Sequence, residues 1–254
     1  MRRPRMGAES VERLIGFVRA HSQASFYRNV WGKAHVFEEL PTISRDDISR
    51  TPPSERRYKN ERGLVKIVQD TANPFSSEWS LEDIGKEVYG VISKRPMVYF
   101  ADACEALEKS LWCYTHDMLP LIGELDPDLA TFSATKYDID SLITDTESLL
   151  KLSKYLESLK KPLTGITVIG DVFKPQDILP FTRFASRIRL LLALPEVGGF
   201  ADAELSMHPT FNLLPNCIVE EEESFVVVTK LTALVTPIIR YRTHIPYSQL
   251  STTL

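Results

Sequence analysis

Two arginines flank a tyrosine near the end of the sequence, in the stretch Arg240-Tyr241-Arg242-Thr243. Side chains alternate between the two faces of a β-strand, so we expect Arg240 and Arg242 to share one face and Tyr241 to take the other. A guanidinium group is costly to bury unless it is paired, and it pairs well with carboxylates and phosphates. The spacing therefore predicts a face that meets solvent, carboxylates or phosphate, which is the first indication of a site.

The elements that must position these arginines are predicted to be strands. Phe225 to Val228 is a run of β-branched and aromatic residues, which is typical of a buried strand. Pro237 suits the first residue of the next strand, where its missing N–H does little harm. The acidic run from Glu220 to Glu223, together with Ser224, indicates a polar turn ahead of them. From Cys217 onward we therefore expect an antiparallel strand region.

The rest of the chain alternates between predicted strands and predicted helices. Strands are expected at residues 63–70, 97–101, 128–134, 163–170 and 189–194, with a loop at 71–77. Helices are expected after Ser10, Ser80 and Asp145 or Thr146, and at residues 25–31, from 105, and 177–187; Ser44 and Asp47 form a capping box. This alternation predicts an α/β fold with mainly parallel sheets flanked by helices, and an antiparallel strand region at the C-terminal end.

Composition and charge argue against nucleic-acid-binding and membrane-spanning classes of protein. The chain has 254 residues, a net charge of −4 and 25% charged residues, so its overall charge gives no reason to expect a nucleic-acid partner. No apolar run approaches the roughly 20 residues that span a bilayer, and Glu9 and Glu12 interrupt any signal peptide, so no membrane association is expected. Its three cysteines lack metal-ligand spacing and fit reduced thiols, which predicts a cytoplasmic protein.

Three stretches, taken together, resemble one protein family. They are residues 21–48, which contain HSQASFYRNVW and ELPTISRDDI; residues 163–199, which contain LTGITVIGD and LLALPEVGG; and residues 226–243, VVVTKLTALVTPIIRYRT. In this order they are similar to the phenylacetate–CoA ligase and acyl-protein synthetase branch of the adenylate-forming (ANL) superfamily. The Arg-Tyr-Arg-Thr motif is the most specific of them, whereas residues 74–144 match only in their rhythm of helices and strands.

The resemblance implies a two-step ligase. A carboxylate attacks ATP to form an acyl-adenylate, and a thiol such as that of CoA then displaces AMP, with Mg²⁺ assisting. It also implies a helical N-terminal segment, residues 1–62, packed on an adenylation-like α/β domain, residues 63–254. The chain ends shortly after Thr243, at Leu254, so we expect the mobile C-terminal lid domain of the family to be absent and, in an active form, to come from a protein partner.

Several family positions differ in this chain. The phosphate loop of the family is rich in glycine, but residues 70–77 contain none. Thr71 is the candidate phosphate donor there, although a surface turn is the favoured interpretation. Glu196 occupies the place of a family glutamate that helps to hold Mg²⁺, and a solvated turn glutamate is an equal alternative.

The ribose clamp also differs. The family carries an aspartate two residues after the motif threonine, where this chain has His244 and then Ile245. Arg242 and Arg240 remain candidates for the nucleotide, but pairing with the Glu220–Glu223 run is favoured. His208 lies where some members carry a zinc histidine, but it has no cysteine partner at ligand spacing, so no zinc is expected.

These departures favour a degenerate adenylate-forming domain, that is, a pseudoenzyme that serves as a binding or scaffold protein. We assign no catalytic residue to it. The alternative is an ATP-dependent acyl- or aryl-CoA ligase, or acyl-adenylating subunit, that activates a carboxylate with a partner's lid domain. A third hypothesis is an unrelated α/β protein in which the Arg-Tyr-Arg-Thr motif occurs by chance.

Overall fold

The structure is a computed structural model that describes residues 16, 24–31, 37–57, 64–68, 75–90, 93–122, 126, 128, 132, 136–159, 161–232 and 235–250. The chain forms two compact units. The first unit comprises Met1–Lys86, Pro195–Phe200 and Leu213–Leu250, and the second comprises Glu87–Leu194, Ala201–Asn212 and Ser251–Leu254. The division predicted at residues 62 and 63 stays a prediction.

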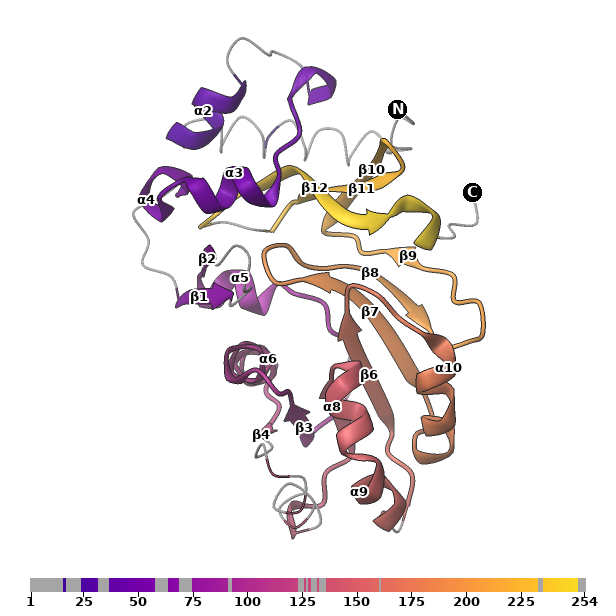
Figure 1. Cartoon of the computed structure of the whole chain (residues 1–254). Coiled ribbons are helices and arrows are strands. Elements are labelled where there is room, and N and C mark those ends of the chain that lie inside the picture. Colours follow the sequence, from indigo (N-terminus) through magenta and orange to yellow (C-terminus); the bar gives the residue numbers. More distant parts are fainter. Residues whose placement is uncertain are drawn as a thin grey trace. The chain divides into compact units, whose positions relative to one another are not determined.

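A parallel sheet is the centre of the second unit (Figure 1). Its parallel strands are β3 (Pro96–Tyr99), β4 (Leu121–Ile122), β5 (Ser141–Thr144), β6 (Gly165–Gly170) and β7 (Ile188–Leu194). The strand order is β4-β3-β5-β6-β7-β8-β9, where β8 is Gly198–Glu204 and β9 is Asn212–Leu213. β5 and β6 are buried through most of their length, as expected of a parallel sheet covered on both faces.

Helices pack around this parallel sheet (Figure 1). They are α6 (Ala103–Thr115), α8 (Thr146–Lys151), α9 (Ser153–Ser158) and α10 (Pro175–Ile178), and a 3-10 helix, Leu179–Phe184, follows α10. α6 contacts β3, and α8 contacts β6. Asp145 caps α8 by accepting from the backbone N–H of Ser148, as its position before the apolar stripe predicts. The predicted continuous helix is divided in two at Leu152.

The first unit contains the antiparallel region predicted from Cys217 onward. β10 (Cys217–Glu222), β11 (Phe225–Lys230) and β12 (Ile238–Pro246) form a three-stranded antiparallel sheet. β12 begins at Ile238, one residue after Pro237, which was predicted to be the first residue of the strand. The polar turn is shorter than predicted, because Glu220–Glu222 belong to β10 and only Glu223 and Ser224 make the turn.

Short helices and a hairpin complete the first unit as far as it is described. The helices are α2 (Ser25–Trp31), α3 (Arg45–Arg50), α4 (Pro53–Arg56) and α5 (Leu81–Gly85), with a 3-10 helix at Phe37–Glu39 and another at Tyr247–Gln249. The capping box of Ser44 with Asp47 is confirmed, and Ser80 forms a second one with Asp83. β1 (Leu64–Val68) pairs antiparallel with β2 (Phe75–Trp79).

Several local predictions are wrong. The loop predicted at 71–77 ends before Phe75, because residues from Phe75 onward pair with β1 as a strand. The helix predicted after Ser80 is short and ends at Gly85, so Val88, which shares the apolar spacing of Ile84, lies beyond it. Asp128 and Phe132, the described residues of the strand predicted at 128–134, are helical. The sequence patterns also miss β4, β5, β8 and β9. The helix predicted after Ser10 lies outside the described residues, apart from Gly16.

The fold class is confirmed: a mixed α/β chain with a mostly parallel, helix-flanked sheet and a separate antiparallel sheet towards the C-terminus. Among the described residues, no helix combines the length and the apolar character needed to cross a bilayer.

Candidate functional site

Arg240 lies in a bulge of β12 and not in regular strand. Val228 pairs with Tyr241 and Lys230 with Ile238, so β12 carries one more residue than β11 between these two pairs. Arg240 takes up the extra length with a φ of +51°, in the left-handed region that costs an L-residue roughly 1–2 kcal/mol. Its backbone N–H donates to Thr229 Oγ1 at 3.0 Å. The bulge therefore re-aims the arginine that the sequence singles out.

The guanidinium group of Arg240 is buried and paired with carboxylates. Its side chain is 3% exposed, and Nε lies 3.2 Å from Oε2 of Glu220, whose side chain is 2% exposed. Glu222 lies 3.9 Å from another guanidinium nitrogen. The group also donates to the carbonyl oxygen of Leu40 and lies over the ring of Phe37. Pairing with the acidic run, which the sequence favours over a nucleotide role, is observed.

Arg242 makes the second ion pair. Its guanidinium group lies 2.7 Å from Oε2 of Glu223, and the two side chains are 36% and 71% exposed. The same group lies over the ring of Phe225 at 5.1 Å. Because this pair is accessible to water, it is screened and readily exchanged. Arg242 is therefore the one of the two arginines that another anion can reach.

Glu196 is held by Tyr241. The phenol of Tyr241 donates to Oε1 of Glu196, and both residues are buried. Burial and then the nearby carboxylate raise the pKa of Tyr241 well above its usual value, so the phenol stays protonated and remains a donor. The other carboxylate oxygen, Oε2, is buried and has no hydrogen-bond partner among the described residues. The solvated turn glutamate considered above does not describe this environment.

The residues after the motif are part of the first unit's interior. Thr243 donates through Oγ1 to the carbonyl oxygen of Val226 at 2.9 Å, and it accepts from the backbone N–H of Ile245 at 3.1 Å. Ile245 is fully buried. Thr71, the candidate phosphate donor, lies outside the described residues. The structure therefore brings Arg240 and Arg242 to one acidic run. It places Glu196 against Tyr241.

The cysteines and His208 show no metal site. No group of three or more histidine, cysteine, aspartate or glutamate side chains within the described ranges is arranged to hold a metal ion. His208 is exposed. Burial raises the pKa of the Cys113 thiol to about 12, which keeps it protonated and unreactive near neutral pH.

A charged cluster in the second unit was not predicted from the sequence. Lys109 of α6 lies 2.6 Å from Glu108 and 3.0 Å from Glu105, and Glu108 accepts from the phenol of Tyr89 at 2.9 Å. Burial alone would lower the pKa of Lys109, but the two carboxylates outweigh it and raise the pKa above its usual value. The cluster is satisfied internally, so it is a structural network and not an open site.

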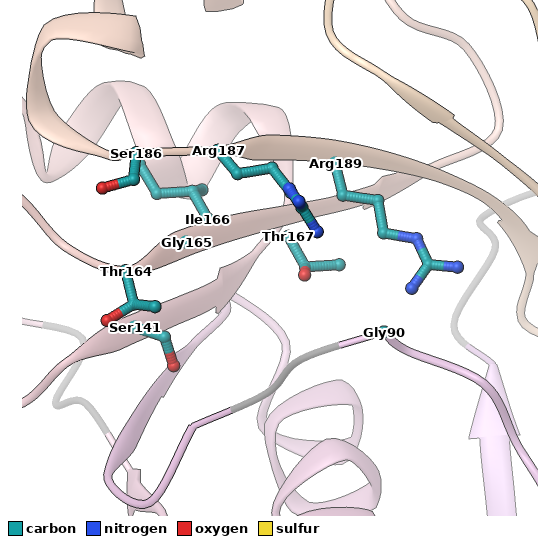
Figure 2. A pocket seen from close by; sticks show the side chains of 9 residues that line it. All are labelled: Gly90, Ser141, Thr164, Gly165, Ile166, Thr167, Ser186, Arg187 and Arg189. Carbon is teal, nitrogen blue, oxygen red and sulfur yellow. The ribbon is translucent and has the colours of Figure 1, made fainter.

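The second unit also contains a pocket of about 400 Å³ that was not predicted from the sequence (Figure 2). It lies where β5, β6 and β7 begin, and its lining includes Ser141, Thr167, Arg187 and Arg189. The signal that could have found it is a second arginine pair at i and i+2, Arg187 and Arg189, at the start of a predicted strand.

The fold is shared with solved CoA ligases. The chain superimposes on a 2-hydroxyisobutyryl-CoA ligase in complex with 2-HIB-AMP and CoA with a TM-score of 0.74, at 11% identity, over 94% of this chain and 70% of that one. E. coli MenE with bound OSB-AMS gives a TM-score of 0.56 at 10% identity, over 70% of this chain and 44% of that one. Bacillus subtilis O-succinylbenzoate coenzyme A synthetase with AMP gives 0.55 at 10% identity, over 69% and 42%.

These likenesses support the resemblance at the level of the fold. The chain spans less than half the length of the two O-succinylbenzoate ligases. No protein-family model and no curated protein sequence matches the chain. The phenylacetate–CoA ligase branch therefore stays a prediction.

Proposed function

We propose that this protein is a non-catalytic binding or scaffold protein built on the adenylate-forming ligase fold. One observation carries the proposal: the guanidinium group of Arg240 is 3% exposed and paired with Glu220, which is 2% exposed. A residue that the resemblance assigns to the nucleotide is thereby committed to the interior of its own sheet.

The free-energy balance opposes recruitment of Arg240 by a nucleotide phosphate. Breaking a buried ion pair by withdrawing one partner costs about 3–5 kcal/mol, because a charge is left in a poorly solvated place. A hydrogen bond to a charged group returns about 1.5–3 kcal/mol. The buried pair with Glu220 therefore outweighs a single new phosphate contact at Arg240.

The residues for ATP and Mg²⁺ do not fit as a set. Ile245, at the ribose position, is fully buried and has no polar side-chain atom. Arg242 is within reach of an anion, but its present partner is Glu223. Glu196 offers one carboxylate oxygen to a metal, while the other accepts from Tyr241. We therefore derive no chemical step through ATP or Mg²⁺ for this chain.

A second candidate function rests on Glu196. A buried carboxylate oxygen without a hydrogen-bond partner is costly, and a metal ion would satisfy it. This favours, as the runner-up, an acyl-adenylating subunit that binds a carboxylate, CoA and AMP or ATP and works with a protein that supplies a lid domain. For this second function we also propose a cytoplasmic location and a substrate that resembles phenylacetate.

Exchange of radioactive pyrophosphate into ATP by the chain alone tests the proposed function, and for the acyl-adenylating subunit it detects activity that does not require the partner's lid domain. The full chain is assayed with Mg²⁺ and a panel of aliphatic and aromatic carboxylic acids, next to the Arg242→Ala and Glu196→Gln variants. The proposed function predicts the same background rate for all three proteins. Acid-dependent exchange by the unaltered chain, lost in Glu196→Gln, would establish the acyl-adenylating function instead.

A further inference from the structure

The pocket in the second unit lies at the amino-terminal ends of its parallel strands. Ser141 is the first residue of β5, Gly165 the first of β6, and Arg187 directly precedes β7. Ser141 pairs with Gly165, and Thr167 pairs with Arg189, so these residues share one face of the sheet. None of the described residues that the resemblance assigns to the nucleotide, Glu196, Arg240 and Arg242, lines this pocket.

Two arginines extend into this pocket from β7 and the residue before it. Figure 2 shows Arg187 and Arg189 extending from the same side of the strand, Arg187 towards Thr167 and Arg189 towards Gly90. Arg187 is exposed and makes no ion pair or hydrogen bond through its side chain within the part of the chain that the structure describes. Arg189 uses its Nε for Asp202, at 2.6 Å. Its terminal guanidinium nitrogens are not used by that contact and remain available as donors, while Asp202 balances its charge, so the net positive charge of the pocket comes from Arg187.

Gly90 makes the position of Arg189 possible. Gly90 has a φ of +64°, and a Cβ built there would lie 1.0 Å from a terminal nitrogen of Arg189. Any other residue at this position would have to displace the guanidinium group. A glycine at 90 therefore keeps Arg189 against the pocket wall, beside the carboxylate that orients it.

A buried hydroxyl group completes the observation. Ser141 is 2% exposed, lines the pocket, and its Oγ has no hydrogen-bond partner among the described residues. A polar atom that is buried without a partner costs about 1–3 kcal/mol. Thr164 and Ser186 also line the pocket. The lining thus combines two cations with hydroxyl donors, one of which lacks an acceptor.

We propose that this pocket binds the phosphate group of a small phosphorylated ligand, with Arg187 supplying the opposite charge, the terminal nitrogens of Arg189 donating to its oxygens, and Ser141 donating to one of them. The volume of about 400 Å³ admits more than a free phosphate ion and lies in the range of small-molecule sites. The site is independent of the proposed scaffold function, because none of its residues belongs to the first unit.

The donor set favours phosphate over carboxylate. A carboxylate has two oxygens, which one planar guanidinium group satisfies in a bidentate manner. A phosphate monoester has three terminal oxygens and carries close to two negative charges at neutral pH. Two guanidinium groups and several hydroxyl donors therefore match the several acceptor oxygens of a phosphate group better than the two oxygens of a carboxylate.

Calorimetric titration of the full chain at low ionic strength tests the proposal. The probes are inorganic phosphate and phenyl phosphate, with benzoate as the carboxylate of matched size. We expect one saturable site for the phosphates and much weaker binding of benzoate. Arg187→Ala should weaken phosphate binding by about tenfold or more, since a hydrogen bond to a charged group is lost. Arg183→Ala, an exposed arginine paired with Glu157, should leave binding unchanged.

Ser141→Ala distinguishes a ligand contact from a structural role. Since the Ser141 hydroxyl has no partner among the described residues, its removal should leave the melting temperature unchanged or raise it, while phosphate binding weakens several-fold. The proposal is overturned by the absence of a saturable phosphate isotherm, by equal affinities of the Arg187→Ala and Arg183→Ala variants, or by benzoate binding as tightly as phenyl phosphate. A Ser141→Ala variant that loses stability but keeps its affinity would also contradict it.

Discussion

Arg240 combines a left-handed backbone conformation with a buried side chain. The φ of +51° costs conformational energy, and the side chain must be desolvated. Both costs are borne because the bulge brings the guanidinium group to Glu220, Glu222 and the carbonyl oxygen of Leu40. The sequence indicated the acidic partners, because two arginines on a strand need them. It gave no sign of the bulge, since arginine carries no preference for a positive φ.

Replacing Arg240 by methionine should destabilise the first unit strongly. The change keeps most of the aliphatic side chain but removes the cation that faces the buried carboxylate of Glu220. We expect a loss of about 3–5 kcal/mol in the free energy of unfolding, measured by urea denaturation. Arg183→Met, which breaks a pair whose side chains are 64% and 59% exposed, should cost about 0–1 kcal/mol. Equal effects of the two changes would show that the Arg240 pair adds no stability.

Tyr241→Phe tests the support of Glu196. The change removes the donor to Oε1 and leaves a buried carboxylate with less hydrogen bonding. A loss of about 1–3 kcal/mol is expected in the same denaturation experiment. Tyr114→Phe is the matched control, because Tyr114 is 74% exposed. If both variants unfold at the same urea concentration as the unaltered chain, the contact contributes nothing to stability.

At the scale of elements, the turn between β10 and β11 shows how backbone geometry overrides residue preference. Glu223 and Ser224 have φ values of +49° and +67°. A two-residue hairpin with both central residues in this region is a type I′ turn, in which asparagine and glycine are strongly preferred. The acidic run predicted a turn, but its residue types do not reveal which two residues form it.

Ser224→Gly should therefore stabilise the hairpin. Glycine adopts the φ of +67° without the steric cost of a Cβ, which is worth about 1 kcal/mol less the entropy that glycine loses on folding. We expect a small rise in melting temperature. The opposite sign is expected for Ser110→Gly within α6, where glycine is a poor helix former and the hydroxyl bond to Ala106 is lost. A fall in melting temperature for Ser224→Gly would contradict the turn geometry.

α6 shows that helical periodicity alone does not predict which face of a helix is buried. The apolar stripe predicts that Leu107 and Tyr114 face the core, but these side chains are 51% and 74% exposed. The buried face instead carries Glu108 and Lys109, which neutralise each other and bond to Tyr89. The carboxylates that pair with Lys109, those of Glu105 and Glu108, are local, but Tyr89 lies outside the helix, and helical periodicity gives no sign of that contact.

At the scale of the whole molecule, buried phenols predict a decline in stability at high pH. Burial, the first cause in each case, raises the pKa of Tyr27, Tyr89 and Tyr241 above the ordinary value near 10. Because the pKa of each phenol is higher in the folded than in the unfolded protein, its contribution to stability is fully present below about pH 10. That contribution is lost as the pH rises further, since the unfolded chain then releases the proton first. Each phenol then contributes a slope of about 1.4 kcal/mol per pH unit.

Urea denaturation between pH 8 and pH 11 measures this decline. We expect midpoints that are level between about pH 8 and 9 and fall steeply above about pH 10, with a shallower fall in Tyr241→Phe. Lys109, whose pKa is also raised, acts in the same direction at still higher pH. A midpoint that stays constant up to pH 11 would show that these phenols are not held protonated by folding.

The fold class and most strands could be read from the sequence, because strand-forming runs and helix caps are local signals. The parallel strands β6 and β7 and the capping boxes follow from such signals. β8 and the pocket could not, since both depend on which strands become neighbours. The site residues were predicted as a group, but the burial of Arg240 and the contact of Tyr241 with Glu196 depend on long-range packing.

Nucleotide binding tests the central claim most directly, because it requires no knowledge of an acyl substrate. The melting temperature of the full chain is measured with ATP, AMP and a stable acyl-adenylate analogue, each with and without Mg²⁺. A ligand at about 100 times its dissociation constant would add about 2.7 kcal/mol of stability. The scaffold function predicts no shift at millimolar nucleotide. A saturable rise that Arg242→Ala or Glu196→Gln abolishes would contradict it and establish a working nucleotide site.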